Sequence, residues 1–192
     1  MDARASMDLL WRGGALDRLV DQRHAALVEH VATVLIASGW QVRAEVSFAQ
    51  FGEQGSLDLL AWHEATRTVL VLEVKTELTS VEETLRRFDV KVRVAAAVAR
   101  DVLGWTPALI GSALVLPEAS TTRRRVADHR ATFETRFPDH GRQLRSWLSE
   151  PKRPFAAIWF LSPAPMVGDK KAGPPRYRVR RPKSPPSDAE GR

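Results

Sequence analysis

The chain has 192 residues, of which 44% are apolar, and no apolar run approaches the roughly 18 residues needed to cross a bilayer. The first residues carry acids among few apolar side chains, which argues against a secretory signal. The chain contains no cysteine, so disulfides and thiolate metal sites are excluded. These features predict one folded domain in a reducing cytoplasm, with no membrane partner.

The net charge of +6 belongs to the C-terminal end of the chain. Residues 170–192 carry eight basic and two acidic side chains, which accounts for the whole net charge and leaves the rest of the chain neutral. From Ser162 onward Pro, Gly and basic residues dominate, so the sequence predicts a disordered basic Pro-rich tail over residues 162–192. Its candidate contacts to nucleic-acid phosphate are Arg176, Arg178, Arg180 and Arg181.

Apolar periodicity predicts the first elements in chain order. After an N-terminal segment of residues 1–15, helical spacing runs over residues 16–38, and Gly39 is the expected stop. Strand-like runs follow over residues 41–48, 56–63 and 68–77. Thr79, Ser80, Glu82 and Glu83 resemble a capping box opening a helix to about residue 103. The predicted buried stripe of this helix is Val81, Leu85, Phe88, Val92, Ala95 and Ala99.

The second half of the chain alternates between the two types of element. A strand is predicted over residues 108–117, helices over 121–137 and 141–148, and a last strand over 155–161. A helix, three strands, and then alternating helices and strands indicate an α/β domain over residues 16–161. The expected architecture is an αβββαβ core with a mixed central sheet flanked by helices.

Three charged side chains interrupt otherwise apolar strands, namely Asp58, Glu73 and Lys75. Desolvation should exclude them from such strands unless they are paired or functional. Strand alternation places Glu73 and Lys75 on the same face of the sheet. If residues 64–67 form the connection between the two strands, the register makes Asp58 and Glu73 direct cross-strand neighbours. The pattern therefore predicts two adjacent carboxylates beside one ammonium group.

Such a cluster suits phosphodiester cleavage. Oxygens of Asp58 and Glu73, together with the backbone carbonyl of Val74, can hold Mg²⁺, which prefers hard oxygen ligands, and Mn²⁺ is the expected substitute. An ion held there polarises a phosphate and lowers the pKa of a bound water, which Lys75 can orient or deprotonate. The alternative interpretation is a structural salt bridge between Lys75 and one acid, which leaves the second acid unexplained.

Three further residues are candidates for the same site. Glu29 lies on a small-residue face of the first predicted helix, and that face can lie flat against a sheet and turn the carboxylate toward a metal. The alternative is a solvated helix glutamate. Lys91 and Arg93 lie off the predicted buried stripe of the second helix, where they are candidates for contact with phosphate. For both, a solvated surface charge is the favoured alternative.

Glu29 in the first helix, Asp58 on a strand and Glu73-Val-Lys75 on the next strand together resemble the PD-(D/E)xK nuclease superfamily. The resemblance covers residues 16–161 and includes the αβββαβ order of elements. Leu57 stands where the motif of that superfamily has Pro, a residue that contacts no metal. The resemblance implies Mg²⁺-dependent cleavage of DNA, with the acids as metal ligands and the lysine at the attacking water.

Residues 11–148 include Val46-Ser-Phe, Phe51-Gly-Glu-Gln-Gly-Ser-Leu-Asp58 and Glu73-Val-Lys-Thr-Glu77. With these motifs the stretch also resembles a poorly characterised bacterial branch whose members are often joined to helix-turn-helix domains and described as transcriptional regulators. Two functions follow from these resemblances. The first is a Mg²⁺-dependent nuclease acting on DNA, with RNA left open as a substrate. The second is a catalytically silent nuclease fold that serves as a DNA-binding or transcription-regulatory module. The oligomeric state, whether monomer or homodimer, also stays open.

Overall fold

The computed structural model describes the backbone of residues 3–162 and the side chains of residues 18–162. The predicted tail, with Arg176, Arg178, Arg180 and Arg181, lies outside the described residues. Within the described part of the chain, no helix combines the length and the apolar character that crossing a membrane requires.

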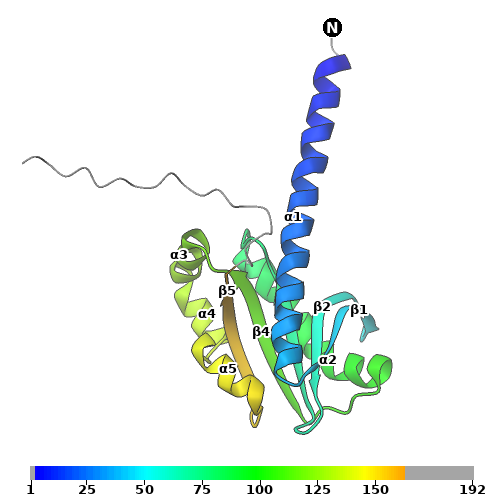
Figure 1. The fold of residues 1–192 in the computed structure, drawn as a ribbon, viewed down its shortest axis with the longest axis vertical. Coiled ribbons are helices and arrows are strands. Elements are labelled where there is room, and N and C mark those ends of the chain that lie inside the picture. Colours follow the sequence, from blue (N-terminus) through cyan, green and yellow to red (C-terminus); the bar gives the residue numbers. More distant parts are fainter. Residues whose placement is uncertain (1–2, 163–192) are drawn as a thin grey trace, which may run out of the picture.

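Five strands form one sheet in chain order, with helices on both sides (Figure 1). Strands β1, β2 and β3 pair antiparallel, whereas β3, β4 and β5 pair parallel. This arrangement confirms the predicted α/β class with a mixed sheet flanked by helices. The elements are α1 (Ala3–Ala37), β1 (Gln41–Gln50), β2 (Glu53–His63), β3 (Thr68–Val74), α2 (Val81–Leu103), β4 (Leu109–Pro117), α3 (Ser120–Asp128), α4 (Arg130–Arg136), α5 (Gly141–Ser149) and β5 (Phe155–Leu161).

Two helices differ from their predicted bounds. Helix α1 begins at Ala3, well before the expected start at residue 16. The helix predicted over residues 121–137 is divided into α3 and α4 at His129, whose φ of −113° and ψ of 29° are not helical. The apolar spacing continues through the break, since Thr122, Phe133 and Phe137 are all buried. For that reason periodicity alone predicts one continuous helix.

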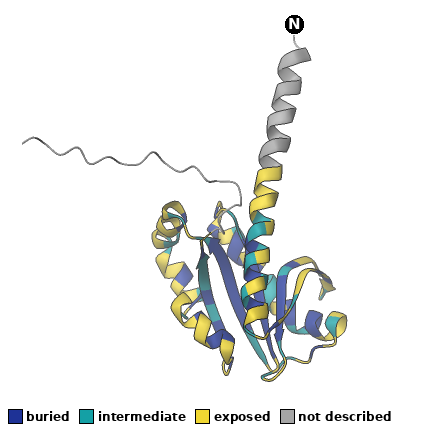
Figure 2. Cartoon of the chain, viewed as in Figure 1, coloured by how far each residue is buried: buried dark blue, intermediate teal, exposed yellow. Residues whose placement is uncertain are grey.

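The sheet separates two apolar cores. Leu27, Val31 and Leu35 of α1 pack with α5 on one face, while α2, Phe133 and Phe137 pack on the other. Every residue of β3 is buried (Figure 2), which explains the apolar run over residues 69–72.

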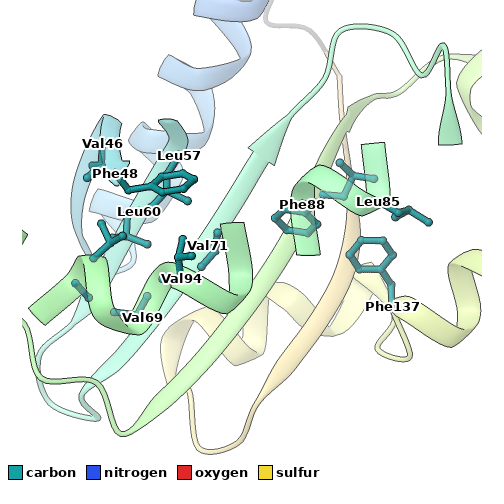
Figure 3. Packing of buried hydrophobic residues seen from close by; sticks show 14 of the residues in the cluster. Val46, Phe48, Leu57, Leu60, Val69, Val71, Leu85, Phe88, Val94 and Phe137 are labelled. Atoms are coloured by element: carbon teal, nitrogen blue, oxygen red, sulfur yellow. The ribbon is translucent and has the colours of Figure 1, made fainter. Parts of the chain in front are cut away.

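Alternation along β3 assigns its side chains to the two cores. Val69 and Val71 lie beside Val94 of α2 (Figure 3), whereas Leu70, Leu72 and Val74 belong to the core under α1. Glu73 continues the series of Val69 and Val71 and therefore points toward α2.

A cap fixes the start of α2 shortly after the end of β3. The Ser80 hydroxyl accepts a hydrogen bond of 3.3 Å from the Glu83 N–H, so Ser80 is the N-cap. Val81, at the first helical position, is buried. Gly104 ends the helix with a φ of 70°, a left-handed conformation that glycine adopts without strain. These contacts hold α2 across the face toward which Glu73 points.

Candidate active site

The hairpin of β2 and β3 has the predicted register. Its ladder pairs Leu59 with Leu72 and ends there, one residue before Asp58 would meet Glu73. The Asp58 carboxylate continues the ladder in place of the backbone, because its Oδ2 accepts a hydrogen bond of 2.8 Å from the Val74 N–H. Asp58 is thus held at the end of β3 by a side chain to backbone hydrogen bond.

The sheet is also interrupted on the other side of Asp58. The β1–β2 ladder skips the position opposite Asp58, where Glu45 has a φ of 52°. A left-handed conformation is uncommon for a residue other than glycine and marks a local distortion of the strand. Beside it lies a hollow of about 380 Å³ lined by His24, Val28, Glu45, Ser47, Ser56 and Asp58. Asp58 therefore borders open space. The periodicity of the sequence did not identify the residues opposite Asp58 as neighbours of the site.

Two lysines complete the cluster around the two acids. Lys75 Nζ lies 2.8 Å from Glu73 Oε1. Lys91 Nζ, from α2, lies 2.9 Å from Asp58 Oδ1 and also contacts Glu73 Oε2. The side-chain exposures are 1% for Glu73, 15% for Lys91, 16% for Asp58 and 35% for Lys75. The two carboxylates converge on one shared ammonium group, and Lys75 lies at the more exposed edge.

The acids keep Lys91 charged despite its burial. Burial lowers the pKa of this lysine, but the carboxylates of Glu73 and Asp58 outweigh burial and raise the pKa above its usual value. A group whose pKa is raised by folding makes its full contribution to stability at pH values below its pKa in the unfolded chain. The contribution of Lys91 is therefore complete at neutral pH and is lost only as the pH rises above about 10.4 and through the raised pKa.

Lys91 corrects an expectation from the sequence. The favoured interpretation, a solvated surface charge, is wrong because this side chain lies between two carboxylates with 15% exposure. A signal for it was present in the sequence. Buried residues flank Lys91 at helical spacing, in the row Thr84, Phe88, Lys91, Ala95 and Val98.

Glu29 lies apart from the cluster. The expectation that its face of α1 packs against the sheet is wrong, because Glu29 is exposed and Ile36 on the same face is 61% exposed. Leu27, Val31 and Leu35 pack there instead, since larger apolar side chains gain more from burial than the alanines on the face of Glu29. The α1 residues that line the hollow beside Asp58 are His24 and Val28.

The other predicted site residues take different positions. Val74, the predicted carbonyl ligand, lies next to Asp58 and donates its N–H to that carboxylate. Arg93 is outside the cluster, with 60% side-chain exposure and an ion pair of 3.0 Å to Glu53. Of the residues predicted to act together, the structure brings Asp58, Glu73, Lys75 and Lys91 into one cluster.

Neither a group of three metal-binding side chains nor the wide cleft along β5 coincides with this cluster. Among the described residues, no three or more His, Asp or Glu side chains are grouped as they would be to hold a metal ion. A cleft of about 1050 Å³ lies along β5 between α1 and helices α3 to α5, and none of the four cluster residues lines it. Of the four cluster residues, Asp58 lines the smaller hollow, which it shares with His24 and Val28 of α1.

Comparison of the chain with models of protein families and with curated proteins finds no match. The geometry of the cluster and the α/β fold that positions it are therefore the features that bear on function.

Proposed function

We propose that this chain is a metal-dependent nuclease that hydrolyses phosphodiester bonds in DNA. One observation carries the proposal, namely that the carboxylates of Asp58 and Glu73 converge on a single cationic group, with Lys75 beside them. The features that resemble the PD-(D/E)xK nucleases are the acid on β2, the acid on β3 with the lysine just after that strand, and the order of elements.

The donor set fits a hard divalent cation. Mg²⁺ is commonly held by one or two carboxylates plus substrate phosphate, and it retains several waters, so two acids are enough. Asp58 and Glu73 would hold it, with the backbone carbonyl of Val74 as the predicted third donor. When bound, such an ion polarises the phosphate and supplies an activated water. Two converging carboxylates and an adjacent hollow thus support Mg²⁺ as the cofactor, with Mn²⁺ as its substitute.

Lys75 is the candidate partner of the attacking water. It follows the last residue of β3, and its N–H donates a hydrogen bond of 3.0 Å to the Val115 carbonyl, which fixes its backbone. Its ammonium group contacts only one of the two acids and is partly exposed, so it can reach a substrate while Glu73 orients it. In this role Lys75 orients or deprotonates the water and offsets charge that develops on the phosphate.

One observation favours a second function. Two lysines already neutralise the two acids, so the cluster is complete as a structural ion-pair network. A catalytically silent nuclease fold that binds DNA or regulates transcription would keep such a network without using metal. This alternative differs from the proposal in a simple way, since it requires neither metal binding nor cleavage.

The deciding experiment incubates the purified protein with supercoiled plasmid in Mg²⁺, Mn²⁺ or EDTA. Nicked or linear DNA is expected with either metal and not with EDTA, and Asp58→Asn should remove the activity. Intact plasmid bound by the protein under all conditions would favour the silent module. Cleavage of single-stranded RNA with intact DNA would change the substrate class but keep the chemistry.

The basic tail is expected to contribute affinity and not chemistry. Residues 170–192 carry the whole net charge, and basic side chains gain affinity for phosphate by counterion release. The logarithm of the binding constant then falls with the logarithm of the salt concentration, with a slope of about −0.9 per phosphate contact. Deleting these residues should weaken duplex binding at low salt and make the salt slope shallower. Cleavage at saturating DNA should stay unchanged. Equal slopes for the full chain and the truncated chain would show that the tail does not contact DNA.

A further inference from the structure

We propose that Lys91 is a resident counter-ion of the carboxylate pair and that a divalent cation binds this site only when Lys91 withdraws. The inference rests on the proposed function, because it takes Asp58 and Glu73 as the metal ligands. It adds a competitor for the metal that is built into the chain. In this view α2 sets the affinity of the site for metal.

The contacts of the two acids identify Lys91 as the competitor. Asp58 Oδ2 is engaged by the Val74 N–H, and Glu73 Oε1 is engaged by Lys75. The two remaining oxygens, Asp58 Oδ1 and Glu73 Oε2, both contact Lys91 Nζ. The oxygens that converge on one point are therefore the two that a shared cation would need.

The charge of the cluster leads to the same conclusion. Two carboxylates and two ammonium groups sum to zero, so the site is neutral as it stands. A divalent cation added beside both lysines would meet like charges at short range in a partly desolvated place, where such repulsion is weakly screened. Withdrawal of Lys91 removes the nearer of these charges, and Lys75 remains at the edge.

The side chain of Lys91 can move away from the two acids. Its ammonium group is carried on a flexible four-carbon stem, and the side chain is 15% exposed, so solvent reaches it without unfolding of α2. Each acid keeps one partner when it leaves, because Val74 still donates to Asp58 and Lys75 still pairs with Glu73. A withdrawn Lys91 stays near the site, where it can meet a substrate phosphate.

Calorimetry with MnCl₂ tests the competition without using activity as the readout. Lys91→Met keeps the length of the side chain and removes its charge, so Mn²⁺ affinity is expected to rise by about 10–100-fold, the range in which groups around metal ligands change affinity. Arg100→Gln removes a positive charge from an exposed position of the same helix and should leave the affinity unchanged. Asp58→Asn should remove binding.

A second measurement uses the unmodified chain, in case Lys91→Met folds poorly. Acetylation by acetic anhydride, read by mass spectrometry, reports how accessible each lysine is. Labelling of Lys91 is expected to rise several-fold when MnCl₂ is added, whereas labelling of Lys152, which is 71% exposed, should not change. The rise should be absent in Asp58→Asn.

The outcomes separate this inference from the proposed function. Mn²⁺ binding that depends on Asp58, with affinity unchanged in Lys91→Met and labelling of Lys91 unchanged by metal, would overturn the competition and keep the metal site. Absence of Mn²⁺ binding in both the unmodified chain and Lys91→Met would overturn the proposed function and the inference with it. Tighter binding in Lys91→Met, or increased labelling of Lys91 with metal, supports the inference.

Discussion

Glu73→Gln is expected to reduce metal-dependent cleavage by roughly 1,000-fold, because a metal at a phosphoryl centre supplies several kcal/mol of charge stabilisation and each ~1.4 kcal/mol is a factor of ten. Glutamine keeps the size of the side chain and removes the negative charge that holds the ion. Plasmid nicking under single-turnover conditions measures the loss. Mn²⁺ affinity in the same variant should fall in parallel.

The same substitution should also lower stability. Glu73 is 1% exposed and pairs with Lys75 and Lys91, so its charge is offset and does not merely repel Asp58. Removing one partner of a buried ion pair lowers stability by about 3–5 kcal/mol. The loss here should be at the lower end of that range or smaller, because Lys91 still pairs with Asp58. Chemical denaturation measures it.

Glu150→Gln is the matched control for Glu73→Gln. It removes an exposed acid whose ion pair, within the described residues, is with Lys152, and it should change neither cleavage nor stability appreciably. Full cleavage by a folded Glu73→Gln variant would show that Glu73 takes no part in the reaction. The ion-pair network would then be a structural feature.

The sequence predicted the geometry of the acids because strand pairing is a nearly discrete choice. A four-residue connection over residues 64–67 leaves one register, and that register brings Asp58 to the end of β3 beside Glu73. The interruption of β1 opposite Asp58 was not predictable in the same way. It depends on a left-handed Glu45, and no glycine or asparagine at that position signals such a conformation.

Helix rotation was harder to predict than strand register. In α1, the stripes of Leu27 and of Glu29 are both compatible with the spacing, and the amount of apolar surface decides between them. In α2, Lys91 is three residues after the fully buried Phe88 and four before the fully buried Ala95, so a small rotation decides whether it faces solvent or the sheet. A charged residue within a buried row is stable there only because the acids of the facing strands neutralise it.

Lys75→Met is expected to remove turnover by about 10²–10⁴-fold, the usual contribution of a group that transfers or positions a proton. Mn²⁺ affinity should remain within a few-fold of the unmodified chain, because Lys75 contacts Glu73 and not Asp58, and is 35% exposed. Single-turnover nicking and calorimetry on the same preparation separate the two effects. Lost Mn²⁺ affinity with retained turnover would reverse the roles given to the lysine and the acids.

Lys75→Arg separates the two ways in which Lys75 can act on the water. Arginine keeps the positive charge and the ion pair with Glu73, but its guanidinium does not release a proton in the working range of pH. If Lys75 orients the water and offsets charge on the phosphate, Lys75→Arg should recover a measurable part of the rate with an unchanged pH profile. If Lys75 is the general base, Lys75→Arg should be as inactive as Lys75→Met at every pH. Full activity in both variants would show that Lys75 only pairs with Glu73.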